Sequence, residues 1–378
     1  MNSESFKVVA QDEGTRARAG VLRTAHGEVE TPTFMPVGTG GTVKAIAQDE
    51  LEELGVQILL ANTYHLYLRP GHEVVQRAGG LHGFMGWPHP ILTDSGGFQV
   101  MSLEGLRRIT DDGVEFQSHL DGSSHFFSPE RVIEFEVALG ADLIMPLDEC
   151  VEFPAGHERV RRAVELTGRW AARSWEKFRE CREEGLSDGQ ALFGIVQGGI
   201  HPELRKQSAE GLLRLDFPGY AIGGLSVGEP KAQTYELVET TTDLLPQAKP
   251  RYLMGVGTPE DLVEAVARGV DLMDCVLPTR NARNGYAFTS AGKVVIKNAR
   301  YREDSEPLDA ACGCRVCQRY SRGYLRHLVQ AQEMLGSMLL THHNLYFYLD
   351  TMREIRQALL RETFSTFYQQ FARVRKQS

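Results

Sequence analysis

The clearest sign of the fold is the segment Asp271-Leu-Met-Asp-Cys-Val-Leu-Pro-Thr-Arg-Asn-Ala-Arg283, where an apolar strand runs into polar residues. The strand delivers Asp274 and then meets a proline, and two arginines and two asparagines follow within the next six residues. A carboxylate can attack carbon, and arginines can hold phosphates in forked hydrogen bonds. The segment therefore predicts a strand end that acts on a sugar–phosphate substrate.

The same order, an apolar strand followed by a polar or glycine residue, recurs along the chain from about residue 46. Helical segments separate the strands, which indicates a parallel sheet with helices on its outer face. Roughly eight such units over this length favour an α/β fold of the (β/α)₈ TIM barrel type over an open sheet. Besides the strand that ends at Asp274, the expected strands are 56–61, 91–93, 142–147, 191–196, 220–222 and 251–254.

Three of the expected helices begin with the same sequence pattern. A possible cap, a proline at the first helical position and an acid in the first turn occur in Ser128-Pro-Glu130, His201-Pro-Glu203 and Thr258-Pro-Glu260. This order satisfies free N–H groups and complements the helix dipole. We also expect a short helix at 49–54 and a long amphipathic helix at 157–185.

Three of the six cysteines are crowded together. Cys312, Cys314 and Cys317 have the spacing C-x-C-x₂-C, and His342 and His343 lie about 25 residues further on. Three thiolates and one imidazole complete a tetrahedral zinc shell with no open position, so a Zn²⁺ ion here would be structural. Either histidine fits the spacing, and the alternative is three buried thiols without a metal.

The two ends of the chain depart from the strand–helix alternation. Residues 29–37 contain two prolines, so we expect an edge or capping strand there rather than a central one. After Arg283 we expect a hairpin at 285–297 and amphipathic helices at 318–336 and 350–374. The sequence thus predicts one barrel domain over 1–378, including a zinc-binding subdomain at 284–350 and a C-terminal helix at 351–378.

In a barrel of this type the chemistry lies at the carboxyl ends of the strands, which share one rim. Polar or glycine residues at these ends form a candidate site, namely Asp94, Asp148, Gln197, Gly224, Gly255 and Asp274. Glycines after Gln197 and at Gly223 and Gly224 expose backbone groups, although close packing is the alternative reason for them. Met254 could form one wall of a slot for a base, although a core position is the more frequent case.

Asp94 opens the stretch Asp94-Ser-Gly-Gly-Phe-Gln99, whose glycines let the backbone approach a flat ligand while Phe98 offers a stacking face. The alternative is a tight turn with a capping aspartate. Asp148 can accept from the N1–H and the exocyclic amine of guanine, or can act as a helix cap or ion-pair partner. Asp274 and Asp94 match the pair of carboxylates of retaining glycoside chemistry. Base exchange follows if a second base completes the reaction in place of water.

Charge and hydropathy narrow the class of protein. The net charge of −9 argues against indiscriminate nucleic-acid binding. Residues 280–302, however, contain six Lys or Arg and no acid, so they could meet phosphates unless they form an ordinary solvated surface. The chain has no run of about 18 apolar residues and its start lacks the order of a signal peptide. We therefore expect a cytoplasmic protein without a membrane span.

Over essentially the whole chain these motifs resemble those of the bacterial tRNA-guanine transglycosylases, also called queuine tRNA-ribosyltransferases. The resemblance rests on the cysteine cluster and on Asp94-Ser-Gly-Gly-Phe-Gln99, Leu147-Asp-Glu-Cys150, Gln197-Gly-Gly199, Gly223-Gly-Leu-Ser-Val-Gly228, Tyr252-Leu-Met-Gly-Val-Gly257 and Asp274-Cys-Val-Leu-Pro-Thr-Arg280. It implies a (β/α)₈ barrel with a zinc subdomain, usually as a homodimer.

The resemblance further implies an enzyme of queuosine biosynthesis that replaces guanine at anticodon position 34 with 7-aminomethyl-7-deazaguanine. Asp274 would attack C1′ of the ribose to form a covalent intermediate, and Asp94 would accept a proton from the incoming base. Cys150 is typical of bacterial members and implies the aminomethyl precursor rather than queuine. The implied base-binding residues are Asp94, Ser95, Gly96, Gly97, Phe98, Asp148, Gln197, Gly224, Leu225 and Met254.

The implied partner is a tRNA with a GUN anticodon, that is the tRNA for Asp, Asn, His or Tyr. The implied RNA path consists of Gly255, Val256, Gly257, Thr258, Pro259, Glu260, Asp261, Thr279, Arg280, Asn281, Ala282 and Arg283. In the family an asparagine follows the zinc histidine. One structural Zn²⁺ per subunit would therefore be held by Cys312, Cys314, Cys317 and His343.

Three rival functions have different sequence signatures. A non-catalytic RNA-binding paralogue should lack one of the two aspartates, yet both Asp94 and Asp274 are present. An archaeal-type relative would normally carry an added C-terminal RNA-binding domain, for which this chain has no room. A barrel glycosidase for small sugars needs no basic rim, so residues 280–302 speak weakly against it.

Overall fold

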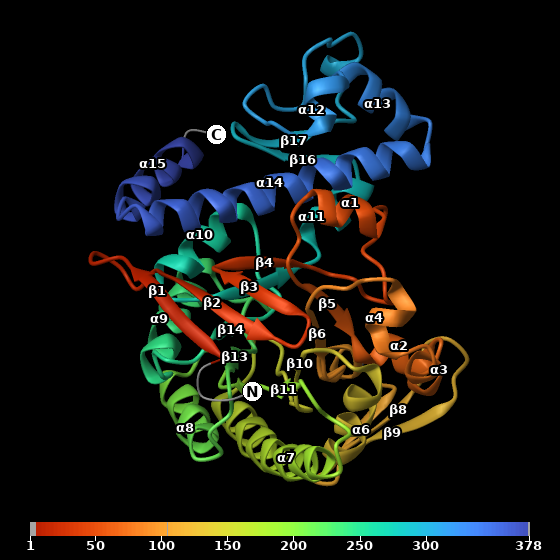
Figure 1. The fold of residues 1–378 in the computed structure, drawn as a ribbon, viewed down its shortest axis with the longest axis vertical. Coiled ribbons are helices and arrows are strands. Elements are labelled where there is room, and N and C mark those ends of the chain that lie inside the picture. The colour runs from red at the N-terminus through yellow and green to blue at the C-terminus, as the bar shows by residue number, and fades with distance from the viewer. Residues whose placement is uncertain (1–4, 104, 377–378) are drawn as a thin grey trace.

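The computed structural model describes residues 5–103 and 105–376, and parallel strands form its centre (Figure 1). These strands are β4 (Thr33–Pro36), β5 (Leu59–Asn62), β6 (Ile91–Asp94), β10 (Leu143–Ile144), β11 (Ala191–Leu192), β12 (Gly194–Val196), β13 (Tyr220–Ile222), β14 (Arg251–Leu253) and β15 (Leu272–Cys275). They pair in the orders β11-β10-β6-β5 and β12-β13-β14-β15-β4. A parallel bridge between Val37 and Leu60 joins β4 to β5, and only Phe193 separates β11 from β12, so the two sheets complete a ring.

The predicted α/β class with parallel strands is confirmed, and neighbours in the ring follow chain order, as a (β/α)₈ barrel requires. The expectation of an edge or capping strand at 29–37 is wrong for its second half. β3 (Gly27–Thr31) is an edge strand, but β4 lies in the ring between β15 and β5. Pro32 precedes β4 and Pro36 ends it, so neither proline removes a hydrogen-bond donor from the middle of the strand.

The amino-terminal end of the ring is closed by an antiparallel sheet of β1 (Phe6–Gln11), β2 (Arg18–Thr24) and β3. Phe6, Leu22 and Val29 from this sheet share one apolar cluster with barrel residues such as Leu92 and Leu272. The interior of the barrel is therefore a packed core with a sealed floor. Its opening lies at the carboxyl ends of the strands.

Helices cover the outside of the ring (Figure 1). Three of them start at the prolines that the sequence pattern predicts, Pro129, Pro202 and Pro259. Ser128 and Thr258 cap two of these helices by accepting from the N–H three residues on, at 3.2 and 3.4 Å. The outer helices are α1 (Gln48–Glu53), α6 (Pro129–Leu139), α7 (His157–Glu183), α8 (Pro202–Leu213), α9 (Lys231–Leu244) and α10 (Pro259–Ala267).

Two insertions were not predicted from the sequence. After β5 come α2 (Thr63–Leu68), α3 (His72–Arg77) and α4 (Gly80–Met85). After β6 come α5 (Gly97–Met101) and an antiparallel sheet of β7 (Arg107–Ile109), β8 (Val114–Gln117) and β9 (Ser124–Phe127). Elements this short show too little periodicity to be recognised.

Beyond β15 the chain builds a lobe that lies over one end of a long helix, α14 (Met334–Leu360) (Figure 1). The lobe has its own apolar cluster, and its hairpin confirms the one expected at 285–297. Its elements are α11 (Leu277–Arg283), β16 (Tyr286–Thr289), β17 (Gly292–Val295), η1 (Ala299–Tyr301), α12 (Arg315–Arg319) and α13 (Arg322–Gln330).

The expected helices at 318–336 and 350–374 are wrong in their bounds. A single helix, α14, spans the gap between them, and α15 (Phe364–Lys376) follows it. The middle of α14 is buried over consecutive residues from Leu339 to Leu345, between the barrel and the lobe. A helix that is buried on all sides has no polar face, so it shows no amphipathic pattern. Within the described part of the chain, no helix has the length and apolar character needed to cross a membrane.

Candidate active site at the mouth of the barrel

An open cavity of about 490 Å³ lies at the carboxyl ends of the ring strands. It brings together residues from several strand ends that are far apart in the sequence. The predicted residues that line it are Asp94, Ser95, Gly97, Phe98, Asp148, Gln197, Gly224, Leu225, Met254, Gly255, Asp274 and Arg280. Gly96 does not line the cavity but forms the turn beneath it, with a φ of +76°.

Asp274 lies near the end of β15 and is held by two donors. The Tyr252 hydroxyl and the Gly255 N–H donate to its Oδ1 at 2.6 and 2.8 Å. Since both donors bond Oδ1, the other oxygen, Oδ2, is the one left to act on a ligand. Burial raises the pKa of Asp274 to about 6, although the hydrogen bonds from Tyr252 and Gly255 partly oppose this shift.

Asp94 ends β6 and accepts four hydrogen bonds. The backbone N–H groups of Thr63 and Gly96 donate to Oδ1 at 3.1 and 3.2 Å. The side-chain amides of Asn62 and Gln99 donate to Oδ2, the latter at 2.9 Å. Burial raises the pKa of Asp94 despite these donors, which favour the charged form. A buried carboxyl with a raised pKa is the kind of group that serves as an acid or base in catalysis.

Asp148 lies opposite in the same cavity and faces an amide. Gln197 Nε2 donates to Asp148 Oδ2 at 2.7 Å, and the Ser95 hydroxyl lies 3.4 Å from Oδ1. Burial raises the pKa of Asp148 to about 6, and the charge of Asp94 adds to this shift. A carboxylate beside an amide can pair with the donor and acceptor edge of a purine.

Glycines make room for this arrangement. A Cβ at Gly224 would lie 2.2 Å from Gln197 Oε1, and the φ of +65° there also favours glycine. A Cβ at Gly97 would lie 2.8 Å from Asp148 Oδ1. A residue larger than glycine at position 97 or 224 would therefore overlap the side chains of Asp148 or Gln197. The Phe98 side chain is 56% exposed at the cavity, where its ring is free to stack on a ligand.

The four predicted metal ligands converge in the lobe. All ligand atoms of Cys312, Cys314, Cys317 and His343 lie within 4.8 Å of one another. His343 Nδ1 is 3.8, 3.4 and 3.3 Å from the three sulfur atoms in that order. Tetrahedral zinc with ordinary bond lengths would place sulfur and nitrogen about 3.6 Å apart. The donor set therefore fits zinc, and His342 is not part of it.

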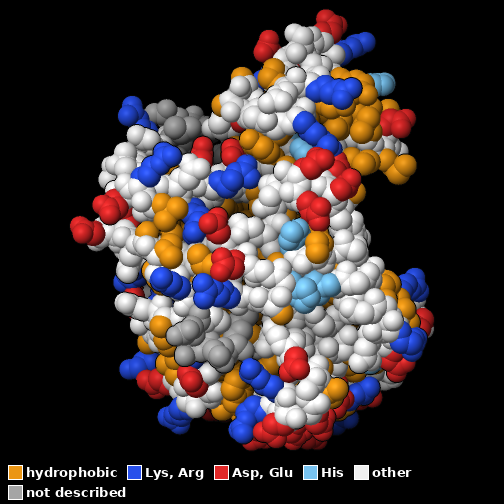
Figure 2. Space-filling model, in the orientation of Figure 1, with side chains coloured by type: hydrophobic (Ala, Val, Ile, Leu, Met, Phe, Trp, Pro, Cys, Tyr) orange, Lys and Arg blue, Asp and Glu red, His pale blue; other side chains and the backbone are white. Residues whose placement is uncertain are grey.

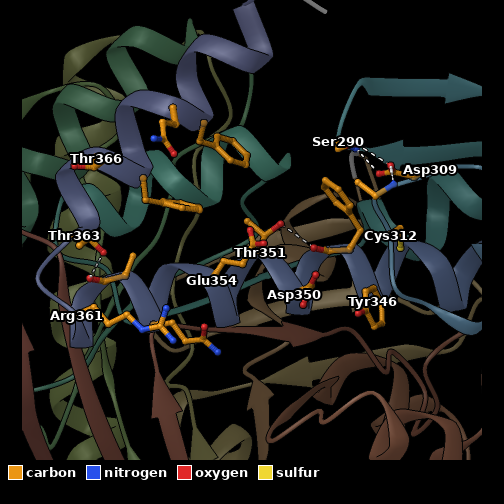
Figure 3. Close-up of a pocket in the computed structure, with 17 residues that line it drawn as sticks. Ser290, Asp309, Cys312, Tyr346, Asp350, Thr351, Glu354, Arg361, Thr363 and Thr366 are labelled. Carbon is orange, nitrogen blue, oxygen red and sulfur yellow. Dashed lines mark hydrogen bonds between the residues drawn. The ribbon is translucent and has the colours of Figure 1, made fainter.

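A second hollow, of about 570 Å³, lies between α14, α15 and the lobe (Figure 3). Two of its acids already have partners. Asp309 accepts from the backbone and hydroxyl of Ser290 at 2.6 and 2.8 Å, and Asp350 pairs with Arg353 at 2.9 Å. Apart from Cys312, none of the predicted site residues lines this hollow, so the candidate active site is the barrel mouth.

Comparison with known proteins assigns the family. A family model described as Queuine tRNA-ribosyltransferase matches residues 12–377. The chain belongs to this family. A queuine tRNA-ribosyltransferase of Solibacter usitatus (strain Ellin6076) is 58% identical over 364 residues, which are 96% of each chain. One of Caldanaerobacter subterraneus subsp. tengcongensis is 57% identical over 371 residues, 98% of this chain and 97% of the relative.

The segments expected to form the RNA path of this queuine tRNA-ribosyltransferase family member are only partly exposed. Gly255, Arg280 and Arg283 are exposed, and Gly255 and Arg280 reach the cavity. Asp261 is buried and accepts from Lys231, Tyr235 and Thr258, so it caps α10. The other buried members of the set are Val256, Gly257, Pro259, Thr279 and Ala282.

Three polar residues that donate hydrogen bonds to Asp94 or Asp274 were given no role from the sequence. Asn62 directly follows the strand expected at 56–61, so the strand-end rule could have found it. Gln99 closes the motif that Asp94 opens, and its amide type was a usable signal. Tyr252 lies inside an apolar strand, where nothing in the sequence separates it from a core residue.

Proposed function

We propose that this chain exchanges guanine at the wobble position 34 of tRNA for 7-aminomethyl-7-deazaguanine, through a covalent intermediate on Asp274. Enzymes of the family exchange guanine in tRNA for a 7-deazaguanine base in queuosine biosynthesis, and this chain is an enzyme of that kind. The observation that carries the finer proposal is the meeting of Asp274, Asp94 and Asp148 in one cavity. The base must leave its stack before the cavity can hold it.

The reaction takes two displacements. Asp274 Oδ2 attacks C1′ of the ribose, the C1′–N9 bond breaks, and guanine leaves with the bonding electrons and a proton from Asp94. The incoming base then gives its N9 proton to Asp94 and attacks C1′, and the ester bond to Asp274 breaks. Two inversions retain the configuration at C1′. The raised pKa of Asp94 supports its role on both sides of the reaction.

Base recognition follows from the polar residues of the cavity. Asp148 would accept from N1–H and the exocyclic amine, while Gln197 and the Gly224 N–H would donate to O6. The Ser95 hydroxyl, 3.4 Å from Asp148 Oδ1, would support that carboxylate. The Ser226 N–H donates to Glu229, which directs the Leu225 carbonyl the other way, where it can accept from the aminomethyl group.

The remaining residues of the cavity would hold the faces of the base and the RNA. Phe98 and Met254 would cover the two faces of the base. Arg280, Arg283 and the acid-free segment 280–302 would meet phosphates of a tRNA with a GUN anticodon, that of Asp, Asn, His or Tyr tRNA. Such contacts make binding weaker at higher salt. A tRNA substrate also supports a cytoplasmic location.

We further propose one structural Zn²⁺ per subunit at Cys312, Cys314, Cys317 and His343. The His343 Nε2 lies 2.7 Å from the Phe288 carbonyl, which fixes Nδ1 as the ligand atom. The ion would hold α12 and the loop before it onto α14. Cys314→Ser should lower bound zinc and thermal stability together. An unchanged melting temperature in zinc-free protein would reject this role.

A homodimer is the expected assembly. Exposed apolar side chains at α13 and the start of α14 support an interface there, and Figure 2 shows apolar surface gathered over these elements. They include Tyr324, Met334, Leu335 and Met338, and Met334 is 82% exposed. Light scattering of the purified protein gives the mass of the assembly.

The decisive experiment follows labelled guanine into purified tRNAs. Transcripts with a GUN anticodon should take up the label, and transcripts with other anticodons should not. The wild type should also form a tRNA adduct that survives denaturation, whereas Asp274→Asn should form none. An undiminished adduct from Asp274→Asn would remove Asp274 from the role of nucleophile.

A further inference from the structure

A buried arginine lies behind the glycine turns of the cavity without an ion-pair partner. Arg205 in α8 is fully buried, and no carboxylate lies within ion-pair distance of it in the described part of the chain. Burial lowers its pKa to about 10, so the guanidinium stays charged at pH 7. A buried charge without a direct counter-charge is costly. Its position therefore needs a reason other than simple packing.

The contacts of Arg205 are with backbone carbonyls of the two glycine turns. Nε donates to the Gly199 carbonyl at 2.8 Å. Nη2 donates to the carbonyls of Gly223 and Gly224 at 3.2 and 3.4 Å. One guanidinium thus joins the turn that follows Gln197 to the turn that begins the Gly223 motif. Gln197, directly before the first turn, and Gly223 and Gly224 of the second turn line the cavity proposed for the base.

These contacts fix the direction of two N–H groups. The peptide bonds after Gly223 and Gly224 are trans, so each carbonyl points opposite to the N–H of the next residue. Carbonyls that face Arg205 therefore direct the N–H groups of Gly224 and Leu225 away from it. Gly224 and Leu225 both line the barrel-mouth cavity, as does Cys150. Within the described residues, neither N–H donates to a backbone carbonyl.

We propose that Arg205 is a positioning residue that aims the N–H groups of Gly224 and Leu225 at O6 of the base and so stabilises guanine as it leaves. This inference rests on the proposed base exchange. As the C1′–N9 bond breaks and the bond from C1′ to Asp274 forms, electron density moves from the carboxylate to the base, and part of it reaches O6. Donors that are already oriented there stabilise the charge without reorganisation. The positive charge of Arg205 lies at the far end of the same peptide dipoles.

The chain offers a matched control at the opposite end of the barrel. Arg251 is also buried, and its guanidinium donates to the carbonyls of Gly269 and Leu245 at 3.3 and 3.0 Å. Burial lowers its pKa to about 10 as well. It does not line the barrel-mouth cavity. Arg205→Lys and Arg251→Lys therefore make the same chemical change in similar surroundings, and only the first lies behind the base site.

The test compares guanine with 2-aminopurine, which keeps the exocyclic amine but lacks O6 and the proton on N1. We would measure the KM for labelled guanine, the inhibition constant of 2-aminopurine, and the single-turnover rate of guanine release from tRNA. Arg205→Lys should raise the KM for guanine about tenfold, slow guanine release about tenfold, and change 2-aminopurine binding less than about twofold. Arg251→Lys should leave the ratio of the two binding constants unchanged. Arg205→Met should lose at least as much as Arg205→Lys.

Three results would overturn the inference. First, the wild type may exchange guanine normally while Arg205→Lys weakens the binding of guanine and of 2-aminopurine equally. Arg205 would then be a purely structural residue. Unfolding of both Arg205 variants, but not of Arg251→Lys, would assign the residue to folding. A wild type without guanine exchange would instead remove the proposed function, and this inference with it.

Discussion

Asp271 lies directly before strand β15 and Asp274 lies near its end, yet the protein holds these two carboxylates in opposite ways. At the floor of the barrel, both oxygens of Asp271 accept from the Arg18 guanidinium, at 2.9 and 2.6 Å, and both side chains are buried. At the mouth, the donors to Asp274 among the described residues are the neutral groups of Tyr252 and Gly255. The floor carboxylate is neutralised by a cation, whereas the mouth carboxylate is left with an unbalanced charge.

A second pair repeats the contrast. Asp142 at the floor lies 2.9 Å from His26 Nδ1 and 3.2 Å from His82 Nε2, and it accepts the Ile91 N–H at 3.0 Å. Burial opposes its ionisation, but these partners outweigh burial and lower the pKa of Asp142 to about 2. Asp148 lies in the loop after β10, at the mouth of the barrel. Burial raises the pKa of Asp148 to about 6. Floor acids therefore stabilise the fold, and mouth acids are poised to exchange protons near neutral pH.

The largest expected effect is the loss of activity on changing a mouth acid. Asp94→Asn should lower guanine exchange by about 10²–10⁴-fold, because an amide can neither give nor take the proton. Its unfolding free energy should fall by at most about 1–3 kcal/mol, because an amide loses acceptance from Asn62 or Gln99 but no cation loses its partner. Exchange kinetics and urea unfolding of the same preparation check both parts. Loss of stability in proportion to loss of activity would erase the contrast with the floor.

A change of a floor acid should lower stability and leave activity almost unchanged. Asp271→Asn should lower the unfolding free energy by about 3–5 kcal/mol, because Arg18 would remain buried without a counter-charge. The fraction that stays folded should exchange guanine at close to the wild-type rate. Urea unfolding and exchange assays below the melting temperature measure the two quantities. A variant that is stable but inactive would show that the floor takes part in catalysis.

The contrast also explains how much could be predicted from the sequence. Strand alternation and the rule that chemistry lies at carboxyl strand ends identified Asp94, Asp148 and Asp274 from residue order alone. The same rule says nothing about Tyr252 or Arg205, because one lies within an apolar strand and the other within a helix. Their roles depend on which atoms they meet across the barrel. The bounds of the long helix α14 could not be predicted, because burial on every side removes the periodic pattern of a helix.

A smaller effect is expected from pH. The pKa of Asp274 is raised from 3.8 to about 6, so its proton is bound more tightly in the folded chain than in the unfolded chain. The cost to stability is therefore present above about pH 6 and is relieved as pH falls towards about 4. Exchange should show an acid limb near the pKa of about 6 and fall about tenfold per pH unit below it, without loss of stability from this group. Asp142, with its pKa of about 2, should contribute no change in this range. Activity that falls only where the protein unfolds would contradict the assignment.

The smallest effect separates the two mouth acids whose pKa values coincide. Asp274 and Asp148 both have a pKa of about 6, so the acid limb alone does not say which carboxylate must be ionised. Tyr252 donates to Asp274, whereas Asp148 accepts from Gln197 and Ser95. Tyr252→Phe removes a donor that favours the charged form, so it should move the limb up by about 1 pH unit and lower exchange about twofold near neutral pH. If the limb stays in place while the variant remains folded, the titrating group is Asp148, and the acid that must be ionised for exchange is the one that reads the base.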